Sequence, residues 1–436
     1  MQSSKTVSTR LERIAELAQR MPETALTSLS HHIDTEWLRE AWRRTRKSGA
    51  PGIDGVTARE YEQDLEANLQ SLLDRAKSGR YRAPAVRRVH IPKGKGDETR
   101  PLGIPTLEDK VLQRAVAMAL GAVYEQDFLP CSYGFRPGRS AHQALEAIWD
   151  GVMDFGQAWV VEVDIRRFFD ALDHSHLRRI LHQRVRDGVL LRLIGKWLKA
   201  GVLESGSISY PDSGTPQGGV ISPLLANVYL HEVLDTWIEE RVAPQLRGPV
   251  RLIRYADDFV LIFRDELDAR RVYQQLPRRF AEYGLQLHPD KTKLVEFRQP
   301  PYSRRERPPV SFDFLGFTHY WGKSRKGGWI VQRKTMSSRV TRSLQAIRSW
   351  CRAHRHDPLR HQHRVLCQKV RGHYGYYGIR GNSRCLKNFH DEVRRIWIKW
   401  LSRRCWKDRL FWSRAEKLLA RHPLPPPRVR HARHTS

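Results

Sequence analysis

Three aspartates in this sequence stand where they could hold a divalent metal ion. Asp257 and Asp258 are adjacent in RLIRYADDFVLIF (251–263), between apolar runs, and Asp164 ends the apolar segment WVVEVDI (159–165). Two adjacent like charges repel and resist burial, so they need either solvent or a strong cation. Taken singly, each position is commonly a solvated turn or a cap. On adjacent strands of one sheet, however, the three would form a carboxylate cluster that needs cations.

Such a cluster favours Mg²⁺, because carboxylate oxygens are hard ligands and Mg²⁺ is usually bound jointly with substrate phosphates. Two such ions about 4 Å apart activate a 3′-hydroxyl and stabilise a leaving pyrophosphate. The aspartates therefore predict metal-assisted nucleotidyl transfer, with a solvated hairpin turn as the simpler alternative for the adjacent pair.

The charge distribution points to a nucleic-acid partner. The chain carries a net charge of +30, and residues 301–436 contribute +26 of it through 33 Lys and Arg against 7 Asp and Glu. The same third of the chain holds seven of the 13 tryptophans. Basic residues interleaved with aromatics suit a phosphate backbone with stacked bases. A high-GC genome would explain the excess of Arg over Lys, but it does not explain the concentration of charge at one end.

Local patterns predict the elements that must position these residues. Segment 159–165 is a β-branched run of strand length, and segment 251–263 is typical of strand–turn–strand with the acidic pair at the tip. Thr106 is expected to cap a long helix. Ser222 at the N-cap, followed by Pro223, predicts a helix over 222–238.

Helices are also expected in the basic third. They should begin near residue 335 and again over 389–411, and the chain should end in an extended, poorly ordered Pro- and Arg-rich tail. The five cysteines are scattered without a CxxC pair, which argues against a disulfide framework and against a cysteine zinc module. A signal-peptide core and a membrane-length apolar run are not evident in the sequence, so we expect a soluble, cytoplasmic protein without membrane contact.

Several sequence blocks together resemble one known family. YADD (255–258) resembles the reverse-transcriptase signature, VVEVDIRRFFDALDH (160–174) the motif of the first catalytic aspartate, and SGTPQGGVISPLLANVYL (213–230) the PQG motif. The remaining blocks, in the family's order, are APGIDGVT (50–57), VHIPKGKGDETRPLGIPTLEDKVLQ (89–113), YGFRPGRSAHQAL (133–145), GLQLHPDKTKLVEF (284–297), FDFLGF (312–317), RGHYGYYGIRGNSRCLKNF (371–389) and FWSRAEKLLARHPLPPPRVR (411–430). A single motif is weak evidence, but this ordered set is similar to group II intron-encoded reverse transcriptases (maturases).

The resemblance implies an α+β fold of the right-hand polymerase type. Fingers and palm, with an antiparallel sheet, would be followed by an α-helical thumb and a basic helical C-terminal segment. The implied domains are an N-terminal extension (1–34), fingers and palm (35–320), thumb or maturase domain (321–390) and a nucleic-acid-binding segment with its tail (391–436).

The resemblance also implies roles for individual residues. Asp164, Asp257 and Asp258 would bind two Mg²⁺ ions with the backbone carbonyl of Ile165, although direct contact of Asp258 stays open. Phe169 would be the steric gate against a ribose 2′-hydroxyl, with Phe168 as the competing residue. The residues expected to bind the nucleotide are Lys93 (or Lys95), Arg100, Phe169, Gln217, Gly218 and Lys291, the last as a general acid to pyrophosphate or as a solvated turn lysine.

The expected partners are group II intron RNA, an RNA template with a DNA primer, dNTPs and a DNA target. Because no CxxC pair is present, we expect no HNH-type endonuclease activity, as in the shorter bacterial members of the family. Two alternatives stay open: a domesticated reverse transcriptase in phage defence or CRISPR spacer acquisition, and a splicing cofactor with vestigial polymerase activity. The retained aspartates rank the second alternative lower.

Overall fold

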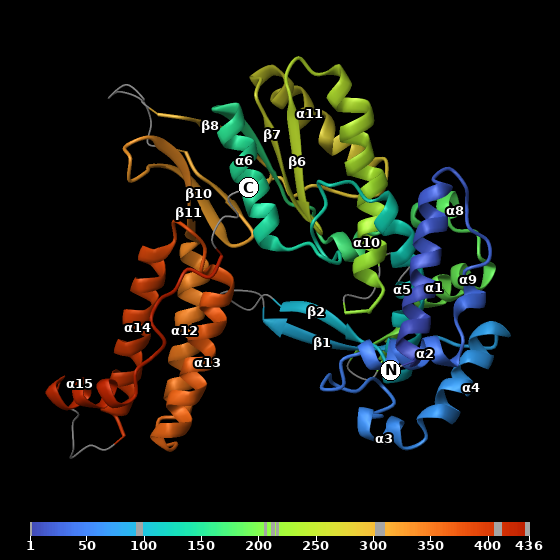
Figure 1. The fold of residues 1–436 in the computed structure, drawn as a ribbon, viewed down its shortest axis with the longest axis horizontal. Helices are drawn as coiled ribbons and strands as arrows, with labels where there is room; N and C mark the ends of the chain where they lie inside the picture. The colour runs from blue at the N-terminus through green and yellow to red at the C-terminus, as the bar shows by residue number, and fades with distance from the viewer. Residues whose placement is uncertain are drawn as a thin grey trace. The chain divides into compact units, whose positions relative to one another are not determined.

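The chain divides into two compact units (Figure 1). This computed structural model describes residues 2–92, 99–204, 207–210, 214, 218–300, 310–404 and 412–431. The first unit holds residues 1–144 and 163–294, and the second holds residues 145–162 and 295–436. Helices and several small sheets are present in the described residues, which confirms the predicted α+β class.

The first unit is mostly helical around one small sheet and one hairpin. Its elements are α1 (Gln2–Arg20), η1 (Ser30–His32), α2 (Thr35–Arg44), α3 (Ala58–Gln63), α4 (Leu65–Lys77), β1 (Val86–Pro92), β2 (Thr99–Ile104), α5 (Leu107–Asp127), α7 (Phe168–Ala171), α8 (His174–Arg184), α9 (Gly188–Leu198), β4 (Val202–Glu204), β5 (Ser207–Ser209), α10 (Ser222–Leu230), η2 (His231–Asp235), η3 (Trp237–Val242), η4 (Ala243–Gln245), β6 (Val250–Tyr255), β7 (Asp258–Phe263) and α11 (Glu266–Ala281). The small sheet has the order β2-β1-β4-β5, with β1 antiparallel to β2 and parallel to β4.

Helix α5 forms the centre of this unit. The Thr106 side chain accepts a hydrogen bond from the backbone N–H of Asp109, so Thr106 is the N-cap that the sequence predicted. Helices α1 and α2 pack against α5. The buried Trp37 ties α2 to it by donating its indole N–H to the Ala115 carbonyl over 3.0 Å.

The strands that carry the aspartates belong to one sheet of order β6-β7-β3-β8. Strand β3 spans Gln157–Val163, and β8 spans Lys293–Arg298. Strands β6 and β7 pair antiparallel, with Tyr255 opposite Asp258. Both the predicted strand near 159–165 and the predicted strand–turn–strand over 251–263 are therefore confirmed.

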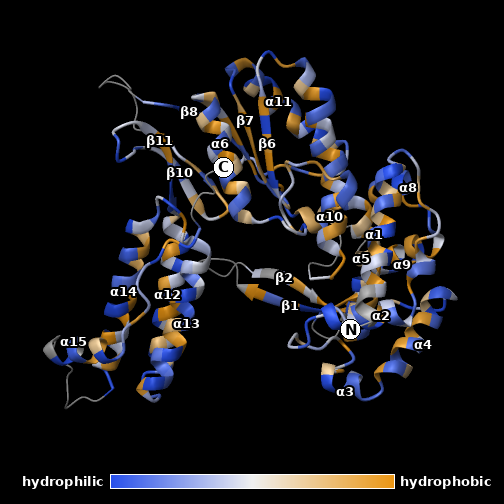
Figure 2. Ribbon diagram, in the orientation of Figure 1, coloured by the Kyte–Doolittle hydropathy of each residue, from blue (hydrophilic) through white to orange (hydrophobic). Residues whose placement is uncertain are grey.

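The second unit joins a small sheet to a group of amphipathic helices. Its elements are α6 (Ala141–Phe155, shared with the first unit), β9 (Phe312–Phe314), β10 (Phe317–Lys323), β11 (Trp329–Thr335), α12 (Ser337–Ala353), α13 (Leu359–Tyr377), α14 (Ser383–Leu401) and α15 (Trp412–Arg421). The sheet has the order β11-β10-β9. Figure 2 shows hydrophilic and hydrophobic residues alternating along α12–α14, as expected for helices that bury one stripe.

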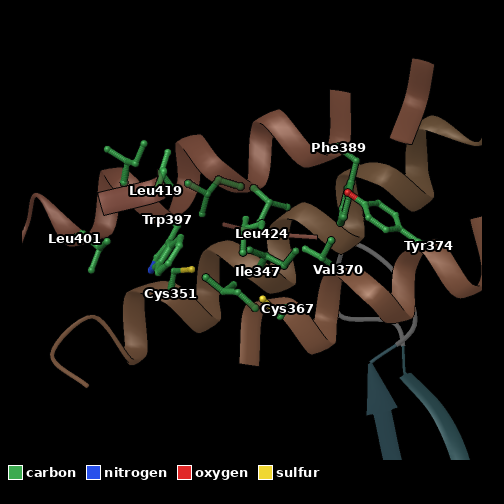
Figure 3. Packing of buried hydrophobic residues seen from close by; sticks show 14 of the residues in the cluster. Ile347, Cys351, Cys367, Val370, Tyr374, Phe389, Trp397, Leu401, Leu419 and Leu424 are labelled. Carbon is green, nitrogen blue, oxygen red and sulfur yellow. The ribbon is translucent and has the colours of Figure 1, made fainter. Parts of the chain in front are cut away.

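One hydrophobic cluster holds α12–α15 together. Figure 3 shows side chains from these helices converging, among them Ile347, Val370, Phe389 and Trp397. The indole N–H of the fully buried Trp397 donates to the Gln362 side-chain oxygen over 3.0 Å, so its one polar atom is satisfied. Naming these helices the thumb remains a prediction.

Three local expectations need correction. Ser222 is the first residue of α10 rather than its N-cap, which is Ile221, and the helix becomes π-helical from His231. Helix α14 begins before the expected 389 and ends at Leu401, while residues 405–411 lie outside the described part.

The described end of the tail is docked rather than poorly ordered. The backbone N–H groups of Arg430 and His431 donate to the Gly378 carbonyl over 2.7 and 3.0 Å, and Leu424 is buried. Gly378 allows this contact because a Cβ there would lie 2.9 Å from the Arg428 carbonyl oxygen. Backbone pairing to the end of α13, which composition does not reveal, fixes the segment.

Two further observations concern the described residues alone. Four cysteines (Cys131, Cys351, Cys367 and Cys385) are free thiols. In the same part of the chain, no helix is long and apolar enough to cross a membrane.

Trp397 tests the helical core. We expect Trp397→Ala to lower the free energy of unfolding of the second unit by about 3–5 kcal/mol, because it opens a cavity and removes the partner of Gln362. Trp400→Ala, on the same helix but half-buried, should cost less. Chemical denaturation followed by circular dichroism measures both variants, and equal losses would contradict the packing in Figure 3.

Candidate active site

A two-residue turn presents the aspartate pair. Ala256 and Asp257 connect β6 to β7, and Asp258 is the first residue of β7. Ala256 is buried and adopts a left-handed φ of 58°, an unfavourable conformation for a residue with a Cβ. Residues 259–263 are all buried, so the apolar run anchors the hairpin. Asp257 is half-buried at the tip and Asp258 is exposed.

A buried ion pair between Arg254 and Asp235 supports this turn. Both Arg254 and Asp235 are fully buried, and the guanidinium Nε and Nη2 lie 2.7 and 2.5 Å from the Asp235 carboxylate oxygens. Arg254 Nη1 donates to the Asn227 side-chain oxygen over 2.9 Å and to the Ala256 carbonyl over 3.2 Å. Burial alone would raise the pKa of Asp235, but the charge and hydrogen bonds of Arg254 outweigh it and lower that pKa.

The YGFRP segment packs directly on the same turn. The Arg254 N–H donates to the Cys131 carbonyl and the Tyr133 N–H donates to the Arg254 carbonyl, each over 2.8 Å. A Cβ on Gly134 would lie 2.3 Å from the backbone nitrogen of Ala256, so only glycine allows this approach. Phe135 follows with a left-handed φ of 58° and a 61% exposed side chain. The sequence patterns did not predict these supporting residues. The glycine in YGFRP was the one available signal of a close backbone approach.

Asp164 follows β3 and is held by the segment that contains Lys291. The Asp164 carbonyl accepts from the His288 N–H over 2.8 Å, and Ile165 forms a bridge with Leu287. Lys291 Nζ lies 2.8 Å from Asp164 Oδ2, with the two side chains 51% and 36% exposed. The lysine that we expected at the pyrophosphate is therefore placed on a candidate catalytic carboxylate.

The donor chemistry fits a divalent cation, although the three carboxylates do not form a closed cage. Within the described ranges, no group of three or more His, Cys, Asp or Glu side chains could hold a metal ion by itself. Mg²⁺ is commonly held by one or two carboxylates plus substrate phosphates, so a protein-only cage is not required. The ammonium group beside Asp164 shows that this carboxylate accepts a positive charge.

The two phenylalanines after Asp164 differ in access. Phe168 is buried, and its ring packs edge-on against the Tyr229 ring with 6.5 Å between the two ring centroids, so it belongs to the core. Phe169 is half-buried. Of the two, Phe169 is therefore the more accessible side chain, and its role as a gate stays a prediction.

Part of the expected nucleotide site lies outside the described residues, namely Lys93, Lys95 and Gln217. Arg100 pairs with Ile91 in the β1–β2 ladder, and its side chain is not described. Gly218 has φ of 113°, and a Cβ there would lie 2.4 Å from the Gly103 carbonyl oxygen. The Gly218 backbone therefore packs closely against strand β2, and its contact with the nucleotide stays a prediction.

Comparison with known proteins identifies the family to which the chain belongs. Residues 91–319 match the family described as "Reverse transcriptase (RNA-dependent DNA polymerase)". The chain belongs to the reverse transcriptase family. It therefore contains an RNA-dependent DNA polymerase domain, and the family generally uses divalent metal ions.

The reverse transcriptase has relatives in Escherichia coli, Lactococcus lactis and Schizosaccharomyces pombe. It is 36% identical to "Protein YkfC" of Escherichia coli (strain K12) over 323 residues, which cover 64% of this chain and 84% of that protein. It is 36% identical to "Group II intron-encoded protein LtrA" of Lactococcus lactis subsp. cremoris over 251 residues, covering 54% and 41%. An "Uncharacterized 91 kDa protein in cob intron" of Schizosaccharomyces pombe is 38% identical over 183 residues, covering 42% and 22%. The chain thus spans less than half of LtrA.

The buried ion pair predicts a non-additive stability effect. Asp235→Leu alone leaves the Arg254 charge buried without a counter-charge and should lower the free energy of unfolding by about 3–5 kcal/mol, as should Arg254→Met alone. The double variant should cost less than either single one, because neither charge is then buried. Urea denaturation completes the cycle, and purely additive losses would contradict a coupled pair.

Proposed function

We propose that this reverse transcriptase makes DNA on an RNA template by two-metal-ion nucleotidyl transfer at Asp164 and Asp257. The observation that carries the proposal is the sheet order, in which the hairpin presenting Asp257 neighbours the strand that ends before Asp164. Asp258 and the carbonyl of Ile165 would complete the oxygen ligands of two Mg²⁺ ions. When bound, these ions would activate the primer 3′-hydroxyl and neutralise the triphosphate.

The protein side chains would bind and orient the incoming nucleotide. Lys93 and Arg100 would hold the triphosphate, and Gln217 and Gly218 would contact the nucleotide or the template–primer. Phe169 would exclude a 2′-hydroxyl.

Lys291 would act at the leaving group. Its ammonium group, 2.8 Å from Asp164 Oδ2, would leave that carboxylate and donate a proton to the pyrophosphate.

The biological setting that we infer is a group II intron. Similarity to LtrA, whose name records that it is group II intron-encoded, supports it. The enzyme would bind its intron RNA, assist splicing and act at a DNA target during mobility, using the basic C-terminal third (+26 of +30). The division into fingers and palm, thumb and C-terminal segment belongs to this proposal. Catalytic-RNA sequences flanking the reading frame test it, and their absence would favour the domesticated alternative.

Asp257 tests the catalytic assignment. With an RNA template, a DNA primer, dNTPs and Mg²⁺, Asp257→Asn should lower primer extension at least about 100-fold, because a neutral amide does not replace a metal-binding carboxylate. Asp290→Asn, which removes an 88% exposed carboxylate near Lys291, is the matched control and should keep wild-type activity. If Asp257→Asn extends primers as well as this control, the assignment is wrong.

Lys291 tests whether Asp164 takes a cation. Lys291→Met removes the ammonium group that competes for this carboxylate, so Mn²⁺ should bind the nucleotide-free protein several-fold more tightly, as measured by electron paramagnetic resonance. Lys293→Met is the control, since Lys293 is exposed two residues further along. Unchanged or weaker Mn²⁺ binding by Lys291→Met would place the metal away from Asp164.

A further inference from the structure

A basic surface cavity lies away from the candidate catalytic residues, within the first unit. Its volume is about 410 Å³, and its walls come from η3 with the residues after it and from α11. The charged and aromatic lining residues are Arg241, Arg271, Arg278, Arg279, Trp237 and Glu282. Four arginines and one glutamate line the cavity, so its lining carries a net positive charge that suits an anion.

Both walls depart from regular α-helical winding. Segments η2 and η3 are π-helical over five and six residues, a conformation that is rare and frequently found at functional sites. Helix α11 contains Pro277 in its interior, where proline removes a backbone donor and disturbs the helix. The cavity therefore lies where both of its helical walls are irregularly wound.

One arginine is fixed as part of the wall. The guanidinium of Arg279 donates to the carbonyls of Val233 and Glu232 over 3.0 and 3.1 Å and lies 3.5 Å from the Glu282 carboxylate. It also stacks over the Tyr283 ring at 4.5 Å. These contacts use the hydrogen-bonding capacity of Arg279 inside the protein, so its role is to shape the cavity.

Two other arginines keep their charge available. Arg241 and Arg278 are exposed, and within the described ranges neither forms an ion pair. Guanidinium groups bind phosphate through two parallel hydrogen bonds, and a tryptophan provides a surface on which a base can stack. Half-buried Trp237 lines the same cavity, and the Arg279 guanidinium lies 5.8 Å from the centre of its ring.

We propose that this cavity binds phosphate groups of a single nucleic-acid strand, with Arg241 and Arg278 as the contacts. The proposal rests on the family's use of a nucleic-acid template, but not on the catalytic assignment of the aspartates. RNA and DNA share the phosphate chemistry, so the strand type is left to the experiment.

The test is the salt dependence of binding by the full chain. A labelled 20-nucleotide RNA and a DNA of the same sequence are titrated over a range of KCl concentrations without metal or dNTP. Each phosphate contact on a single strand contributes about 0.7 to the slope of log K against log salt. The double variant Arg241→Gln, Arg278→Gln should therefore lower the slope by about 1.4.

A matched control separates a site from general positive charge. Arg20→Gln with Arg59→Gln removes the same charge from exposed positions on α1 and α3 and should change the slope by less than half as much. A lower slope for RNA alone assigns the cavity to RNA, and a lower slope for both strands assigns it to either. An unchanged slope, or an equal fall in the control, overturns the proposal.

A second measurement uses the wild-type protein and does not depend on the folding of a variant. RNA containing 4-thiouridine is cross-linked by light, and the modified peptides are identified by mass spectrometry. Adducts within 237–246 or 271–282 support the cavity, and adducts confined to other segments overturn it. Because these assays measure binding without synthesis, an enzyme that makes no cDNA would still give a clear answer.

Discussion

The candidate active site depends on one buried ion pair, Arg254 with Asp235. Burying two charges is costly unless they are paired and hydrogen-bonded, and here the guanidinium also serves Asn227 and the Ala256 carbonyl. The pair therefore joins the helical segment before the hairpin to the turn that carries Asp257. It also gives a physical reason for the left-handed conformation of Ala256, since the surrounding contacts over-determine it.

A second constraint acts on the neighbouring carboxylate. Asp164 is fixed through its backbone to the segment after α11, and its side chain is matched by the ammonium group of Lys291. A basic residue that holds an aspartate until a metal and a nucleotide arrive would keep the site from carrying unbalanced negative charge. On this account, the same lysine is then released to the leaving group, which links charge compensation to catalysis.

Local patterns predicted the elements but not the contacts that support them. The apolar runs on both sides of the acidic pair predicted the β6–β7 hairpin, and the capping chemistry of Thr106 predicted the start of α5. The partner of Arg254 was not predictable, because Asp235 reaches it from a π-helical turn whose winding no local pattern signals. The docking of the tail on Gly378 was not predictable either, because it depends on backbone hydrogen bonds between segments that are distant in the sequence.

The most direct test is an experimental structure of the enzyme with an RNA template, a DNA primer, a non-hydrolysable dNTP and Mg²⁺. We expect the carboxylates of Asp164 and Asp257 to hold the ions, with Lys291 no longer in contact with Asp164. We also expect Arg254 to remain bonded to Asp235 next to the turn. Ions bound elsewhere, with Lys291 still paired to Asp164 in the complete complex, would contradict the account.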